Sequence, residues 1–138
     1  MTFGESIKTV FSKYATFSGR ASRSEYWWFV ALNSVVGLVI YLIAAPSGLT
    51  IDSMATNGGS SLAIIEAFPG WASALLGCYS LAVLLPSLAV SVRRLHDIGK
   101  GGGWIFISLV PLIGGIWYLV LMLLPSQLGD NRFGSQPN

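Results

Sequence analysis

The chain has 138 residues, of which 53% are hydrophobic and only 10% are charged. In a typical soluble domain about a quarter of the residues are charged, and a domain of this size leaves much of its surface in water. The composition therefore excludes a soluble globular domain and predicts a single all-α membrane domain over residues 1–138, with lipid as its main solvent. The formal net charge of +2 excludes no class of partner by itself.

Residues 2–17 alternate apolar and polar side chains at the period of a helix. Phe3 and Phe11 fall on the apolar face, and Lys8 and Lys13 fall on the opposite face. Beside a membrane span, we expect such an amphipathic helix to lie in the membrane interface with its lysines toward anionic headgroups. Packing of the helix against the transmembrane bundle is the alternative.

The segment that follows places two arginines beside two tryptophans. Ser22 and Glu25 have the spacing of a capping box, which predicts that a helix starts here. Capping does not account for the arginines and tryptophans, whose combination suits a phosphate-rich membrane interface, with the tryptophans as interfacial anchors. These residues are Arg20, Arg23, Trp27 and Trp28, and Trp104 is expected to anchor the third span in the same way.

Three long stretches contain no Asp, Glu, Lys or Arg. A transmembrane helix needs about 20 mainly apolar residues to cross a hydrocarbon core of roughly 30 Å. We therefore predict three transmembrane helices, at residues 26–45, 68–92 and 104–124, followed by a polar tail at residues 125–138. Asn33 in the first span is expected to form a hydrogen bond to another helix.

The third stretch is interrupted by Pro111 and by Gly114-Gly115. Such residues are tolerated in a transmembrane helix when neighbouring helices satisfy the freed backbone groups, but they also occur at the turn of a re-entrant segment. We prefer a complete crossing because residues 104–124 have full spanning length.

The second span ends in the sequence Arg93-Arg94-Leu95-His96-Asp97-Ile98-Gly99. Arg93 and Asp97 are four residues apart, so they are expected to pair on one face of the helix. Cations suit the C-terminus of a helix, and Gly99 is a suitable terminator.

The basic residues predict the orientation of the chain. Four precede the first span, none lies in the first loop, three lie between the second and third spans, and one is in the tail. The positive-inside rule then places the N-terminus and the loop after the second span in the cytoplasm. Three complete crossings place the tail outside, whereas a re-entrant third segment places all eight basic residues in the cytoplasm.

Motifs for catalysis, metals and cofactors are largely missing from the sequence. One His and one Cys cannot form a closed zinc site, and no phosphate-binding loop or dinucleotide fingerprint occurs. We therefore expect no metal, no cofactor and no catalytic residue. No predicted span carries an internal charge, which counts against a pump. Basic residues at membrane boundaries do not favour nucleic-acid binding.

Three clusters at the ends of the spans carry a resemblance to a known family. They are Gly19-Arg20-x-Ser22-Arg23-x-Glu25-Tyr26-Trp27, Arg93-Arg94-Leu95-His96-Asp97-x-Gly99, and Asn131-Arg132-Phe133-Gly134 with Pro137. In this order they resemble the signature of domain of unknown function 805, a family of small bacterial inner-membrane proteins. The resemblance implies a bacterial source and an inner-membrane location, and it implies no activity. The chain departs from the family at Lys100–Gly103, where glycines replace its usual Ser-Gly-Trp-Trp continuation.

We hypothesise a non-enzymatic scaffold or accessory subunit that binds anionic lipid headgroups or a membrane-protein partner through a basic cytoplasmic face. A homo-oligomer or a larger membrane complex is a possible setting, and no nucleic acid is expected. The alternatives are a small oligomeric transporter or channel, and a membrane enzyme that acts on a lipid phosphate with His96 as acid or base. The predicted binding residues are Arg20, Arg23, Glu25, Arg93, Arg94, His96 and Asp97, with a tail motif of Asp130, Asn131 and Arg132.

Overall fold

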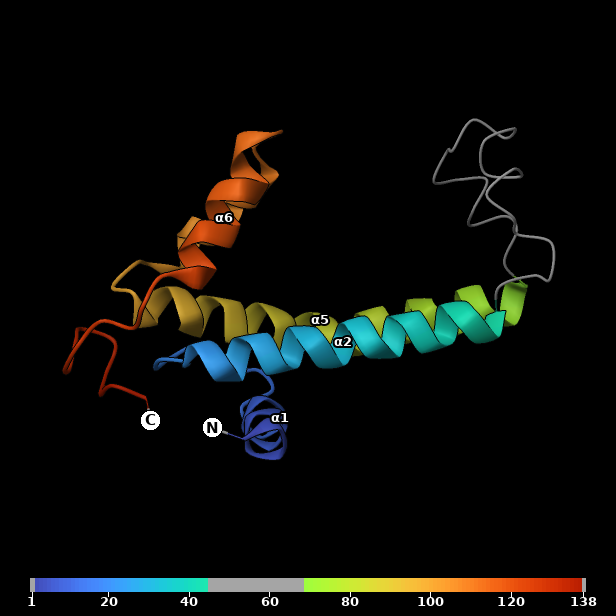
Figure 1. Ribbon diagram of the computed structural model, residues 1–138, viewed down its shortest axis with the longest axis horizontal. Coiled ribbons are helices and arrows are strands. Elements are labelled where there is room, and N and C mark those ends of the chain that lie inside the picture. Colours follow the sequence, from blue (N-terminus) through green and yellow to red (C-terminus); the bar gives the residue numbers. More distant parts are fainter. Residues whose placement is uncertain (1, 45–68, 138) are drawn as a thin grey trace. The chain divides into compact units, whose positions relative to one another are not determined.

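The computed structural model describes residues 2–44 and 69–137 of the chain (Figure 1). Residues 1–31 and 84–138 form one compact unit, and residues 32–83 form another. The first loop and the outer ends of the predicted spans, at residues 45 and 68, lie outside the described residues. Within the described ranges the chain is helical apart from turns, loops and one isolated bridge between Asn131 and Gly134, so the all-α class is confirmed.

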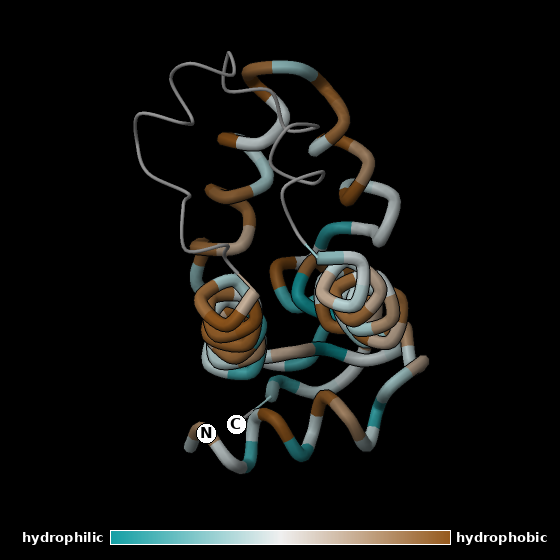
Figure 2. The backbone as a smooth tube through the Cα atoms, turned by 90° about the vertical axis from the view of Figure 1, so that its right-hand side faces the viewer, coloured by the Kyte–Doolittle hydropathy of each residue, from teal (hydrophilic) through white to brown (hydrophobic). Residues whose placement is uncertain are grey.

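The described residues include two long helices. Helix α2 covers Arg23–Ala44 and helix α5 covers Gly70–Asp97, and both are long and apolar enough to cross a membrane. Figure 2 shows both helices largely in the colour of hydrophobic residues. The hydroxyl of Tyr79 donates to Oδ1 of Asn33 at 2.7 Å, which confirms the predicted interhelical hydrogen bond. Such side-chain bonds between helices are favourable where water is scarce.

Helix α1 covers Phe3–Ser12, so the predicted N-terminal helix is present but ends five residues before Phe17. A capping box that sequence analysis missed starts it: the Thr2 hydroxyl accepts from the Glu5 backbone N–H, and the Glu5 carboxylate accepts from the Thr2 N–H at 2.8 Å. The backbone bond from Thr2 lowers the pKa of Glu5. Beyond Lys13 the chain continues as a turn.

Helix α1 packs on the start of α2 and runs across it rather than along it (Figures 1 and 2). Phe3 meets Trp28 edge to face with ring centroids 5.5 Å apart, and Phe11 meets Phe29 in the same way at 6.1 Å. Aromatic pairs in this geometry are favourable beyond the area that they bury. The contacts agree with packing against the bundle, and an interfacial position of α1 stays a prediction.

The predicted third span is not one transmembrane helix. A 3₁₀ helix, η1, covers Gly102–Leu109, and a short α-helix, α6, covers Ile113–Leu123 with 11 residues. An α-helix of that length extends about 16 Å, roughly half of a hydrocarbon core. The two helices pack against each other as a hairpin, so the expectation of a continuous helix over residues 104–124 is wrong.

The reversal between η1 and α6 has an identifiable cause. Pro111 lacks a backbone N–H, and Leu112 adopts a positive φ of 66°, which turns the chain back on itself. Two residues later the helices approach so closely that a Cβ on Gly114 would lie 1.9 Å from the carbonyl oxygen of Ile107. A Cβ on the neighbouring Gly115 would meet nothing within 4 Å.

This contrast gives a matched test of the hairpin. Gly114→Ala should destabilise it by about 1–3 kcal/mol because α6 must move away from η1. Gly115→Ala should be neutral or stabilising by up to about 1 kcal/mol, since alanine favours the helix. Thermal unfolding of both variants in detergent, followed by tryptophan fluorescence, measures the difference. Equal melting temperatures would show that η1 and α6 do not pack as described.

Candidate functional site: a buried ionic cluster

Five charged side chains from distant parts of the chain meet where α2 begins and α5 ends, inside the unit of residues 1–31 and 84–138. We call them the buried ionic cluster. None of them is more than 5% exposed, and three are completely buried. The members are Arg20, Glu25, Arg93, Arg94 and Asp97.

The charged side chains near the end of α5 bind different partners. Nη1 of Arg93 donates to Oε1 of Glu25 in the first turn of α2 at 2.6 Å. Asp97 instead accepts from Arg94, three residues before it, and from Arg20 at 3.0 Å. The predicted pairing of Arg93 with Asp97 is therefore wrong, because Glu25 of the neighbouring helix takes Arg93.

The capping prediction for α2 is confirmed at Ser22. The Ser22 hydroxyl accepts from the backbone N–H of Glu25 at 3.2 Å, as an N-cap residue does. The Glu25 carboxylate accepts from Arg93, so this residue joins two helices. The cap thereby fixes the turn of α2 that carries the acid of the cluster.

Arg20 connects the helices to the C-terminal tail. Its Nε donates to Oδ1 of Asp97 at 3.0 Å, and its Nη groups donate to the carbonyl oxygens of Gln127 and Gly129 at 2.5 and 2.6 Å. The tail therefore lies against the start of α2 and the end of α5 (Figure 1). A planar guanidinium with five donors is suited to hold several acceptors at once.

Arg94 caps a helix other than its own. Its guanidinium donates to the carbonyl oxygens of Met122 and Leu124, at the C-terminus of α6, while it also holds Asp97. Carbonyls at a helix C-terminus lack partners within the helix and carry partial negative charge. Arg94, a residue of α5, thus stabilises the C-terminal end of the hairpin of η1 and α6.

Cations outnumber acids in the buried ionic cluster by three to two. Backbone carbonyls from the tail and from α6 offset part of this excess, because they accept from Arg20 and Arg94. Within the described residues, Nε and Nη2 of Arg93 have no hydrogen-bond partner. Binding of an anionic headgroup or a partner protein by these arginines stays a prediction.

His96 connects the cluster to the tail motif. Its Nδ1 lies 3.1 Å from the carbonyl oxygen of Gly19, so Nδ1 carries the proton of that bond. The ring stacks on Phe133 with centroids 3.9 Å apart, and Nδ2 of Asn131 donates to the His96 carbonyl at 2.9 Å. In the ranges that the structure describes, no group of three His, Cys, Asp or Glu side chains could hold a metal ion.

The remaining predicted site residues lie outside the cluster. Asn131 is half-buried by its bonds to α5 and Gln127, and Trp27 is also half-buried. The others are exposed, so they face the surroundings at this end of the protein. The exposed residues are Arg23, Trp28, Trp104, Asp130 and Arg132.

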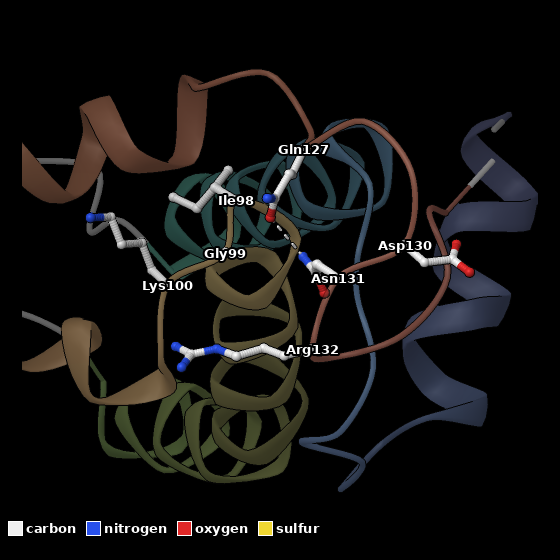
Figure 3. Close-up of a pocket in the computed structure, with 7 residues that line it drawn as sticks. All are labelled: Ile98, Gly99, Lys100, Gln127, Asp130, Asn131 and Arg132. Carbon is white, nitrogen blue, oxygen red and sulfur yellow. Dashed lines mark hydrogen bonds between the residues drawn. The ribbon is translucent and has the colours of Figure 1, made fainter.

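A cleft of about 460 Å³ opens between the turn after α5 and the tail (Figure 3). Sequence analysis singled out neither Lys100 nor Gln127, which help to form it. We call it the tail cleft. Its lining residues are Ile98, Gly99, Lys100, Gln127, Asp130, Asn131 and Arg132.

Gly99 allows the tail to reach α5. It has a φ of +76°, and a Cβ there would lie 2.8 Å from Oε1 of Gln127. The side chain of Asn131 donates to this same oxygen, and the backbone N–H of Gln127 donates to the carbonyl of Asp97. The predicted role of Gly99 as a helix terminator is confirmed, and the close approach of Gln127 is a second reason for glycine.

The buried ion pair of α2 and α5 can be tested by substitution. Arg93→Met should destabilise the protein by about 3–5 kcal/mol, because it leaves Glu25 buried without its cation. The double variant Glu25→Met with Arg93→Met should recover most of this loss, since no charge is then left unpaired. Melting temperatures in detergent measure both effects.

The exposed Arg23 provides the matched control, and Arg23→Met should change the melting temperature little. A double variant less stable than Arg93→Met alone would contradict the assigned pairing. A loss in Arg23→Met as large as in Arg93→Met would contradict the assigned burial.

Comparison with known proteins identifies the family that the three motifs resemble. The family model described as protein of unknown function, DUF805, matches residues 14–135, a range that contains the three motifs except Pro137. Inner membrane protein YhaI of Escherichia coli strain K12 is 34% identical over 129 residues, covering 94% of this chain and 92% of that protein. Inner membrane protein YhaH of the same strain is 32% identical over 128 residues, covering 93% and 92%. No solved structure matches the chain.

Proposed function

The chain belongs to the DUF805 family of proteins of unknown function, and on that premise we propose a bacterial inner-membrane scaffold or accessory subunit without catalytic activity. Its basic cytoplasmic face binds anionic lipid headgroups or a membrane-protein partner. The observation that carries the proposal is that two membrane-length helices meet the buried ionic cluster and the exposed basic residues at the same end.

The membrane location is supported by the relatives and by the helices. YhaI and YhaH are both named as inner membrane proteins. Helices α2 and α5 have the length and composition of membrane spans. The basic residues near the start of α2 and the end of α5 favour a cytoplasmic position for these two helix ends. In the proposed topology α2 runs outward and α5 runs inward.

We propose that η1 and α6 form a re-entrant hairpin rather than a third crossing. The tip of the hairpin is apolar and exposed, with Leu109 76% exposed and Leu112 90% exposed. The bonds from Arg20 to carbonyls of the tail support a tail on the same side of the membrane as the start of α2. This arrangement brings all eight basic residues to the cytoplasmic side.

Cysteine accessibility in intact cells tests this topology. In a Cys78→Ala background, Gly58→Cys should react with an impermeant thiol reagent added outside, whereas Gly102→Cys and Ser135→Cys should not. All three should react after the cells are permeabilised, which controls for expression and access. Reaction of Ser135→Cys from outside would refute the re-entrant hairpin, and an unreactive Gly58→Cys would refute the orientation.

In this proposal the buried ionic cluster holds the cytoplasmic face together, and exposed basic side chains contact the headgroups. Lys8 is exposed on α1, Lys13 is exposed at the C-cap of α1, and Arg23 is exposed at the start of α2. Each basic group near an anionic surface contributes about 1 kcal/mol. The aromatic rings of Trp28 and Trp104 suit the same depth in the membrane.

Lipid retention tests the proposed function. The full chain, purified in mild detergent, should retain phosphatidylglycerol in preference to phosphatidylcholine in native mass spectrometry. A variant with Lys8, Lys13 and Arg23 replaced by Gln should weaken this retention by roughly a hundredfold, since three basic groups are lost. The exchange Lys8→Arg, Lys13→Arg and Arg23→Lys keeps the charge and should bind like the wild type. Equal retention of both lipids by the wild type would refute the lipid-binding role.

A further inference from the structure

The tail cleft presents two cations on one side. Figure 3 shows the side chains of Lys100 and Arg132 extending in the same direction, while Asp130 extends away from them. Asp130 is the one acid among the residues that line the cleft. In the part of the chain that the structure describes, neither Lys100 nor Arg132 forms an ion pair.

Aromatic rings hold both cations in place. Nζ of Lys100 lies 4.9 Å from the ring centroid of Trp104, and Cζ of Arg132 lies 4.6 Å from that of Phe133. A cation over an aromatic face is attracted to it without losing its hydrogen-bond donors. The two side chains are therefore restrained before any ligand arrives, which reduces the entropy lost on binding.

The floor of the cleft offers a further donor. Oε1 of Gln127 is occupied, because it accepts from Nδ2 of Asn131 at 3.1 Å. This bond orients the Gln127 amide, whose NH₂ forms no hydrogen bond within the described residues and is available to a ligand. A guanidinium, an ammonium and an amide donor together suit a phosphate group, which carries only acceptors.

The position of the tail cleft favours a lipid as the source of that phosphate. Lys100 lies two residues before η1, and Trp104 lies in the first turn of this helix. From there the hairpin continues with exposed apolar side chains, including Phe106 and Ile113. The cleft thus opens where the chain passes from polar loop to apolar hairpin, as expected at the level of the headgroups.

We propose that the tail cleft binds the phosphate of one anionic phospholipid between Lys100 and Arg132. This inference rests on the proposed function and names one specific site within it. It differs from the general attraction of the basic face because it predicts a single lipid that is held more tightly than the others.

The experiment compares two double variants of the cleft. The cleft variant, Lys100→Gln with Arg132→Gln, removes both cations, whereas the control, Lys100→Arg with Arg132→Lys, keeps them. Phosphatidylglycerol is titrated into the delipidated full chain and followed by native mass spectrometry. The cleft variant should bind the tightest lipid about thirtyfold more weakly, whereas the control should bind it like the wild type.

Two further measurements complete the test. Asp130→Asn removes the acid of the cleft and should strengthen binding, so the site can be assessed even if the cleft variant is poorly folded. Inorganic phosphate in large excess should fail to displace the lipid; displacement would assign the site to the free ion instead.

The outcomes separate this inference from the proposed function. If the wild type prefers phosphatidylglycerol but the cleft variant keeps its tightest lipid, the site is refuted and the proposed function stands. If the wild type shows no preference for anionic lipid, both are refuted.

Discussion

The contact of Asp97 with Arg20 and Arg94 is the interaction on which this end of the protein depends. Burial of an ion costs several kcal/mol, and this cost is offset only when good geometry and further hydrogen bonds accompany the pairing. Here each arginine also binds carbonyl oxygens, Arg20 in the tail and Arg94 at the end of α6. One carboxylate thereby holds the start of α2, the end of α5, the hairpin and the tail in one arrangement.

Sequence predicted the features that depend on local length and composition. Helices α2 and α5 were predicted because a charge-free apolar stretch of spanning length is a local property. The hairpin was only the alternative prediction, since residues 104–124 have full spanning length and the reversal at Leu112 is signalled only by Pro111 and Gly114. The residues of the buried ionic cluster were predicted as two motifs at the cytoplasmic ends of the first two spans. Their pairing was missed, because helical spacing says nothing of the partner that a neighbouring helix supplies.

The tail illustrates why backbone groups escape sequence analysis. Arg20 recognises carbonyl oxygens, which every residue possesses, so no side-chain pattern marks their position. Only the glycines gave a hint: Gly99 must lack a Cβ because Gln127 lies against it. Backbone carbonyls also account for part of the excess of arginines over acids in the buried ionic cluster. Their dipoles supply negative potential that additional Asp or Glu side chains would otherwise have to supply.

The dependence of Arg20 on residues 127 and 129 has a consequence for biosynthesis. Arg20 is synthesised 107 and 109 residues before the residues whose carbonyls satisfy it. Until then its guanidinium must stay in water or among headgroups, because an incompletely satisfied charge is costly to bury. Closure of this end of the protein therefore cannot precede the synthesis of residues 127–129, and a nascent chain that stops short of them leaves the guanidinium without these acceptors.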